Sequence, residues 1–176
     1  MLRSGFTVMI LPLALAIFAA RGGEDNLQFR GALVAEPCVI PPGEENIALD
    51  FGTVISKYLY ANQRTKSEPF ILHLTECDPA IAGSVSVTFS GAESAALPGL
   101  LAPDAGSAAK GIAIGIETAS GSAQPLNKPS PSSALLAGDN RLSWQAFVQG
   151  EPAALADKSL TPGAFTATAT FSLDYE

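Results

Sequence analysis

The chain offers few side chains that could carry out chemistry. Its one histidine, His73, lies between two leucines in an alternating apolar segment, so we predict that its side chain faces solvent. No Gly-x-Ser-x-Gly sequence supplies a nucleophile on a strand-to-helix turn. The adjacent Glu44 and Glu45 stand in a Pro/Gly-rich loop, where solvated charges are a better interpretation than the paired carboxylates of a glycosidase. We weigh a serine hydrolase and a glycosidase, and predict no enzyme.

Cofactor and metal chemistry lack the residues that they require. The glycine-containing run over residues 111–115 has neither the lysine of a phosphate-binding loop nor the spacing of a dinucleotide fingerprint. Asp104 and Asp139 do not have the spacing of a calcium loop. Two cysteines and one histidine are too few for a zinc cluster. The sequence predicts no cofactor and no bound metal.

The charge balance excludes a further class of partner. The chain has 10 Lys and Arg residues against 17 Asp and Glu residues, a net charge of −7. Nucleic acids and anionic membrane surfaces are bound by clustered basic side chains. We therefore predict no nucleic-acid partner.

Residues 1–22 have the pattern of a secretory signal peptide. Arg3 precedes an apolar stretch over residues 6–20, and small residues follow it. The stretch is shorter than the roughly 20 residues of a membrane-spanning helix, which disfavours the alternative of a membrane anchor. Cleavage after Gly22 places the small residues Ala20 and Gly22 at positions −3 and −1, which signal peptidases recognise. We predict export, a mature chain that begins at residue 23, and no direct membrane insertion.

Export changes how the two cysteines are interpreted. Cys38 and Cys77 enter an oxidising compartment and are the only cysteines in the sequence. We predict one intrachain disulfide between them. In the chain-entropy account, closing a loop of about 40 residues restricts the unfolded chain by roughly 4 kcal/mol.

Most of the mature chain alternates between apolar and polar residues with a period of two, not 3.6. Turn residues separate the alternating segments, which indicates an antiparallel β-sandwich. A Ser/Gly/Pro-rich stretch over residues 119–138 is expected to form a surface loop. The alternating segments are residues 27–33, 47–51, 70–77, 84–90, 111–117, 142–148 and 164–175.

The last segment gives the clearest pattern. Thr, Ser and Asp residues occupy one face of the predicted strand, and apolar residues occupy the other. Alanines at the centre of the apolar face leave a shallow trough where a partner side chain could sit. The alternative is an ordinary half-buried strand. The apolar face consists of Phe165, Ala167, Ala169, Phe171, Leu173 and Tyr175.

The start of the mature chain carries a matching feature. Leu27, Phe29, Gly31 and Leu33 alternate with other residues ahead of Cys38. An exposed arm of this kind can add to the edge of another sheet, because main-chain hydrogen bonds supply affinity and alternate side chains supply specificity. The alternative is the first strand of the sandwich itself.

Together these features resemble the pilins of the chaperone–usher pathway, over essentially the whole mature chain. The resemblance rests on residues 25–31, on the cysteine pair, on Gly163 at the fourteenth position from the end and on the penultimate Tyr175. It implies an all-β fold, an incomplete immunoglobulin-like β-sandwich that lacks its seventh strand. The expected organisation is a donor-strand extension over residues 23–33 followed by a pilin domain over residues 34–176.

The resemblance also implies partners and a route. A periplasmic pilus chaperone inserts a strand beside the last strand of such pilins and anchors the terminal carboxylate, which in this chain belongs to Glu176. At the outer-membrane usher, the arm of a neighbouring pilin subunit replaces the chaperone strand. Residues 163–176 would form the acceptor groove, and residues 27–33 would fill the groove of a neighbour. The subunit would pass through the periplasm to a cell-surface, extracellular fimbrium.

The position in the fibre has several interpretations. Residues 29–31, 91–99 and 167–171 look most like minor tip subunits of P pili, especially the adaptor type. One alternative is a fibre-terminating subunit. Another is a pilin that itself binds a host receptor through Trp144, Tyr58 or Tyr60, because aromatic rings stack on sugars. We interpret Trp144 as a core residue and the two tyrosines as loop or edge residues.

Overall fold

The computed structural model describes residues 29–31, 33 and 35–176 of the chain. The chain separates into two units, residues 1–34 and residues 35–176, and the described helices and strands belong to the second unit. These elements in chain order are α1 (Ser56–Asn62), β1 (Glu68–Cys77), β2 (Ser84–Ser90), β3 (Ile112–Thr118), β4 (Ser133–Ala134), β5 (Gly138–Gly150), α2 (Pro152–Ala156) and β6 (Thr170–Tyr175). The signal-peptide prediction and Leu27 lie outside the described residues.

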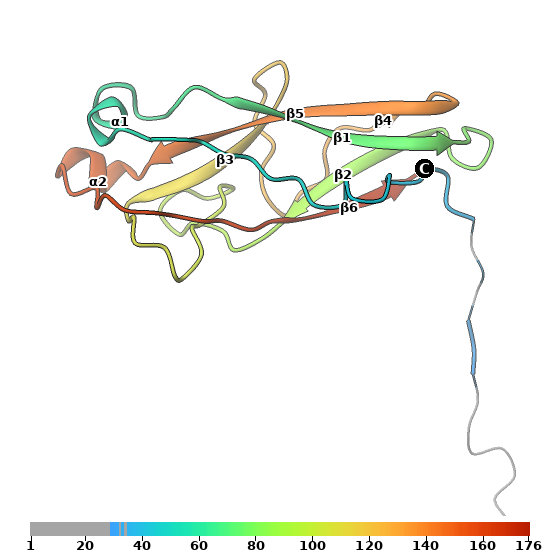
Figure 1. Cartoon of the computed structure of the whole chain (residues 1–176), viewed down its shortest axis with the longest axis horizontal. Coiled ribbons are helices and arrows are strands. Elements are labelled where there is room, and N and C mark those ends of the chain that lie inside the picture. Colours follow the sequence, from blue (N-terminus) through green and yellow to red (C-terminus); the bar gives the residue numbers. More distant parts are fainter. Residues whose placement is uncertain (1–28, 32, 34) are drawn as a thin grey trace, which may run out of the picture. The chain divides into compact units, whose positions relative to one another are not determined.

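The strands form two antiparallel sheets. One sheet has the order β1-β5-β3 and the other has the order β4-β2-β6. Figure 1 shows β1 and β5 in one layer and β2 and β6 in the other. The predicted sandwich is therefore confirmed, and helix is confined to two short elements among the described residues.

The core lies between the two sheets and follows the period-two pattern. Leu72 and Leu74 of β1 face Val85 and Val87 of β2, and all four side chains are at most 1% exposed. Trp144 of β5 packs against neighbouring rings in the same cluster, one stacked and one edge-to-face, and is 5% exposed, so it is a core residue as predicted. Burial of apolar surface at this density is the main favourable term that holds the sheets together.

Two short helices, which the alternation did not predict, close one end of the sandwich (Figure 1). Leu59 of α1 and Ala154 of α2 pack with Val148 in a second apolar cluster. The α2 helix begins with Pro152, whose fixed φ suits the first helical turn. Tyr58 and Tyr60 belong to α1, and not to a loop or strand edge as expected. Within the described residues, no helix is long and apolar enough to cross a membrane.

One predicted strand is absent and another is shorter than the sequence pattern indicated. Residues 47–51 form no strand, although Leu49 and Phe51 still pack against the core. The final strand begins at Thr170 and not at residue 164. Neither stretch has a complete ladder of backbone hydrogen bonds to a neighbouring strand. The alternation therefore predicted which side chains face the core, but it did not predict whether the backbone pairs with another strand.

Candidate functional site

The β6 strand forms an open edge of its sheet. Among the described residues its ladder partner is β2, and beyond the ladder Ser84 and Glu176 exchange two backbone hydrogen bonds of 3.0 Å. Hydrogen-bonded and non-hydrogen-bonded pairs alternate along an antiparallel ladder. Phe171, Leu173 and Tyr175 therefore turn their backbone N–H and C=O groups away from β2. The residues that offer the free backbone edge are also those whose side chains face the core.

In the segment that precedes β6, alternate residues also direct their backbone hydrogen bonds to one side. The carbonyl oxygen of Ala164 accepts a hydrogen bond from the Ala108 amide at 2.8 Å, and that of Thr166 accepts one from the Asp104 amide at 2.8 Å. Thr168 donates its hydroxyl to the Asp104 carboxylate at 3.2 Å. Even-numbered residues thus bond to one neighbouring segment. The odd-numbered residues between them carry the apolar face, and within the described part of the chain no strand pairs with their backbone groups.

Gly163 marks the start of this edge. A Cβ atom there would lie 2.7 Å from the Ala108 Cβ and 3.0 Å from two backbone atoms of Ala108 and Ala109. Real Cβ atoms essentially never come so close. A glycine at this position therefore lets the last segment pass tightly against residues 104–109, which set its path toward β6.

The apolar face of the last segment is incompletely buried. Val85 and Val87, on the paired strand β2, are each 1% exposed. By contrast, every apolar side chain of the last segment packs against the same core yet remains partly exposed, and the burial pattern alternates without a break. These residues are Phe165, Ala167, Ala169, Phe171, Leu173 and Tyr175. A sheet that ended in a complete core would bury them.

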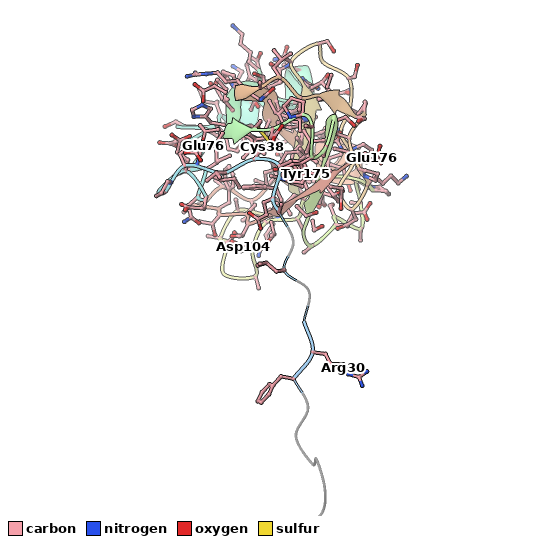
Figure 2. All side chains as sticks on the ribbon, turned by 90° about the vertical axis from the view of Figure 1, so that its right-hand side faces the viewer. Arg30, Cys38, Glu76, Asp104, Tyr175 and Glu176 are labelled. Carbon is pink, nitrogen blue, oxygen red and sulfur yellow. A yellow bond between two sulfur atoms is a disulfide. The ribbon has the colours of Figure 1, made fainter. Side chains whose placement is uncertain are left out.

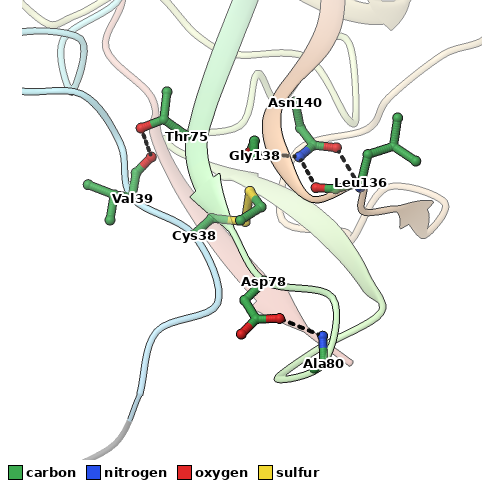
Figure 3. Close-up of a disulfide and its surroundings, with 9 residues drawn as sticks. Cys38, Val39, Thr75, Asp78, Ala80, Leu136, Gly138 and Asn140 are labelled. Atoms are coloured by element: carbon green, nitrogen blue, oxygen red, sulfur yellow. Dashed lines mark hydrogen bonds between the residues drawn. A yellow bond between two sulfur atoms is a disulfide. The ribbon is translucent and has the colours of Figure 1, made fainter.

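The last segment forms one wall of a groove, and the stretch from Cys38 to Phe51 forms the opposite wall. The Cys38–Cys77 disulfide is formed as predicted (Figure 3). Val39 exchanges two backbone hydrogen bonds of 2.8 Å with Thr75 of β1. The disulfide ties this wall to the end of β1. At the other end, the rings of Phe51 and Phe165 lie 6.3 Å apart. The two walls approach each other there.

Between these walls lies a groove of about 450 Å³. Figure 2 views the molecule from the end at which Cys38 and Tyr175 are found. Burial and the negative charge of Glu36 raise the pKa of Tyr175, so its phenol stays neutral at physiological pH. The groove is therefore apolar at its base, with a carboxylate at its mouth. Its lining residues are Glu36, Cys38, Val39, Ile40, Phe171, Leu173 and Tyr175.

This arrangement can take up an extended peptide. A strand laid along β6 would pair with the free N–H and C=O groups, and every second side chain would enter the groove. The sequence identified the residues of the β6 wall but missed Ile40 and Phe51 of the opposite wall. The alternation over residues 47–51 did indicate that the side chain of Phe51 faces the core. Because we interpreted these residues as an ordinary strand, Phe51 was not assigned to a wall of the groove.

The predicted donor arm is described only in part. Phe29 is 88% exposed and the side chain of Leu33 is fully exposed. A Cβ built on Gly31 would have no atom within 4 Å.

His73 is less solvent-exposed than the sequence suggested. It lies on the outer face of β1 as predicted, but its side chain is only 21% exposed and its Nδ1 lies 3.3 Å from the Glu44 carboxylate. Its Nε2 is buried without a hydrogen-bond partner. The loop that carries Glu44 covers the ring. Within the described residues, no group of three or more His, Cys, Asp or Glu side chains could hold a metal ion.

The sequence matches the family model described as "Fimbrial protein" over residues 27–176. The chain therefore belongs to the fimbrial protein family, the structural subunits of chaperone–usher pili that are exported to the cell surface. Its fold is similar to that of a subunit in a solved structure of a chaperone–usher pilus, which was described as revealing the molecular basis of rod uncoiling. The likeness has a TM-score of 0.68 and 26% identity, and covers 88% of this chain and 96% of that chain.

Among curated proteins, the chain is similar to subunits of both major and minor types. It is 32% identical to the major MR/P fimbria protein of Proteus mirabilis over 96% of both chains. It is 33% identical to the fimbrial adapter PapK of Escherichia coli, over 94% of this chain and 96% of that protein. The family is structural and not enzymatic. The likeness to both types leaves the position in the fibre to be tested.

Proposed function

We propose that this pilin assembles by donor-strand exchange. The single observation that carries the proposal is the last segment, whose apolar side chains are half-buried while its backbone edge lacks a partner strand among the described residues. An open edge above an incomplete core makes a monomer prone to aggregation. A partner strand would satisfy the edge and bury the face together. The acceptor groove is formed by residues 163–176 and completed by the wall from Cys38 to Phe51.

Two partners would occupy the groove in turn. A periplasmic chaperone would first lay its own strand along the groove and hold the terminal carboxylate of Glu176 with basic side chains. At the outer-membrane usher, the arm of a neighbouring pilin would replace that strand. The arm of this chain, with Leu27, Phe29, Gly31 and Leu33 as its inward residues, would enter the groove of another subunit. Transit through the periplasm follows from this route.

A charge placed in the groove tests the proposal. In the variant Ala169→Arg, a guanidinium would project from the apolar face toward the space for the donor strand, where its desolvation is costly. We expect loss of co-purification with the chaperone and loss of incorporation into fibres. Both are measured by affinity capture from the periplasm and by immunoblotting of sheared fimbriae.

The neighbouring position provides a matched control. Thr170 follows directly as the first residue of β6, with its side chain exposed on the outer face and its backbone paired to Ser90. Thr170→Arg adds the same charge one residue away but outside the groove, so capture and incorporation should remain near those of the unaltered chain. If Ala169→Arg is captured and incorporated as well as Thr170→Arg, the groove is not the binding site.

We further propose that the subunit occupies a minor, adaptor-type position near the tip. The support is the 33% identity to the fimbrial adapter PapK, together with the FRG arm at residues 29–31. Immunogold labelling of intact fibres should place a few copies per fibre at the distal end. Labelling along the whole shaft would identify a major subunit, and labelling only at the cell-proximal base would identify a terminator.

A further inference from the structure

A carboxylate is fixed on the outer face of the last segment, beside the alanines of the groove strand. The Asp104 carboxylate accepts the Thr168 hydroxyl at 3.2 Å, and the Asp104 amide donates to the Thr166 carbonyl at 2.8 Å. Ser107 donates its amide to the Asp104 carbonyl at 2.9 Å and its hydroxyl to the Thr166 carbonyl at 3.1 Å. A carboxylate can accept about four hydrogen bonds, of which the Thr168 hydroxyl supplies one. Asp104 is therefore a preorganised acceptor with capacity for a further donor.

Uncharged side chains make up the rest of this outer face along the groove. The outward residues of the last segment from 166 to 172 are threonines and a serine, and the next charge is Asp174. The paired strand β2 adds Ser86, Thr88 and Ser90 to the same face. A donor strand laid along the last segment would direct every second side chain to this face. Because opposite charges on neighbouring strands stabilise pairing and like charges oppose it, Asp104 would favour a donor strand with a basic outward side chain.

The shape of the groove sets the register of an arm such as the one that this chain carries. When that arm is extended, Phe29 and Gly31 face one side and Arg30 faces the other. The groove walls approach each other where the rings of Phe51 and Phe165 lie 6.3 Å apart, and a glycine suits this end because it adds no side chain. With Gly31 at this end, only an antiparallel arm places Phe29 over the alanines at residues 167 and 169.

We propose that Asp104 selects the donor arm of a neighbouring pilin that carries arginine directly before its groove-facing glycine, as this chain's own arm does. In the antiparallel register, with the glycine opposite residue 165 or 167, the arginine is opposite residue 166 or 168. Both of these threonines bond to Asp104. Neighbouring strands lie about 4.8 Å apart, so the long arginine side chain can cross one strand and pair with the carboxylate. This inference rests on the proposed function, since it requires a donor strand in the groove.

The test is a competition between two synthetic peptides of residues 24–35, one unaltered and one with Arg30→Ser. The peptides carry different fluorescent labels and are offered in equal amounts to the complex of the full exported chain with its chaperone. The readout is the ratio of arginine peptide to serine peptide bound to the chain. We expect this ratio to fall about twofold to fivefold in Asp104→Asn, as for the loss of an exposed ion pair. Asparagine keeps an acceptor oxygen for the Thr168 hydroxyl.

The ratio separates selection from damage to the groove, because a distorted groove would take up less of both peptides. Asp139→Asn is the matched control, since it removes an exposed carboxylate near the start of β5, in the other sheet. A fall for Asp104→Asn alone, abolished in about 1 M salt where the Debye length is about 3 Å, supports the proposal. An unchanged ratio, an equal fall in both variants, or a fall that salt does not reduce overturns it. Failure of the unaltered chain to take up either peptide would instead overturn the proposed function.

Discussion

At the scale of single residues, one buried carboxylate organises the outer face of the β1-β5-β3 sheet. Glu117 is 4% exposed and accepts hydrogen bonds from both Arg64 Nη atoms, at 2.8 and 3.0 Å. Ser67 and Gln145 donate to it as well, at 2.6 and 3.0 Å. The Arg64 guanidinium also stacks 3.6 Å above the centre of the Phe147 ring. The network ties the segment that follows α1 to β3.

Replacing this carboxylate should destabilise the domain. Glu117→Gln keeps the shape but removes the charge that Arg64 pairs with, and it turns one acceptor into a donor. We expect a loss of about 1–3 kcal/mol in the free energy of unfolding, measured by chemical denaturation of the mature chain. The control is Glu68→Gln on β1, an exposed carboxylate whose replacement should change stability by less than about 0.5 kcal/mol.

The same residue gives the stability a pH dependence. Hydrogen bonding to Arg64 is the largest effect on Glu117 and holds its pKa below the ordinary value of 4.5, against the opposing effect of burial. A carboxyl group with a depressed folded pKa stabilises the fold above its unfolded pKa, and this contribution is lost as pH falls through the folded pKa. The difference in the free energy of unfolding between the unaltered chain and Glu117→Gln should therefore become smaller as the pH is lowered. A difference that is constant from pH 7 to pH 3 would contradict this origin.

At the scale of elements, alternation predicted most of the strands and neither helix, and it missed β4, which lies inside the expected loop over residues 119–138. The expected strand over residues 84–90 agrees with β2, because both inward valines pack in the core between the sheets. The α1 helix was not predicted because seven residues are too few to show a 3.6-residue period, and tertiary burial of Leu59 supplies much of its stability. Likewise, the alternation over residues 164–169 could not distinguish a paired strand from an extended segment bonded on one side.

The path of the last element depends on Gly163. Gly163→Ala would place a Cβ against Ala108 at 2.7 Å and force the segment away from residues 104–109. Misplacement of this start shifts the residues that line the groove, so we expect a lower unfolding midpoint and weaker chaperone capture. Gly106→Ala is the matched control, since a Cβ there meets no atom within 4 Å. Comparable losses in the two variants would show that close packing at Gly163 is not the cause.

At the scale of the whole molecule, the proposed function divides the chain between an acceptor domain and a donor arm. The groove lies within residues 35–176, and the arm belongs to the other unit. Because every residue that lines the groove comes from residues 35–176, losing the arm should not affect the groove. The proposed function therefore makes capture by the chaperone and donation to a neighbour independent properties of one subunit.

Deletion of residues 24–33 tests that independence. The shortened chain keeps residues 163–176 and the disulfide, so chaperone capture should equal that of the unaltered chain. Incorporation into fibres should fall below detection, because no side chains remain to fill the neighbour's groove and main-chain pairing across it is lost. Affinity capture measures the first property and immunoblotting of sheared fimbriae the second.

A point substitution separates the loss of side-chain fit from the loss of length. Phe29→Ser keeps the arm at full length and removes one large apolar side chain, which is 88% exposed in the free chain. Burying such a side chain is worth about 1.5–3 kcal/mol, so the exchange that seats it should be roughly ten- to hundredfold less favourable. Arg30→Ser alters the next residue, which points to the other side of an extended strand, and should reduce incorporation less. If the shortened chain still enters fibres, residues 23–33 are not the donor strand, and the exposed phenylalanine requires another partner.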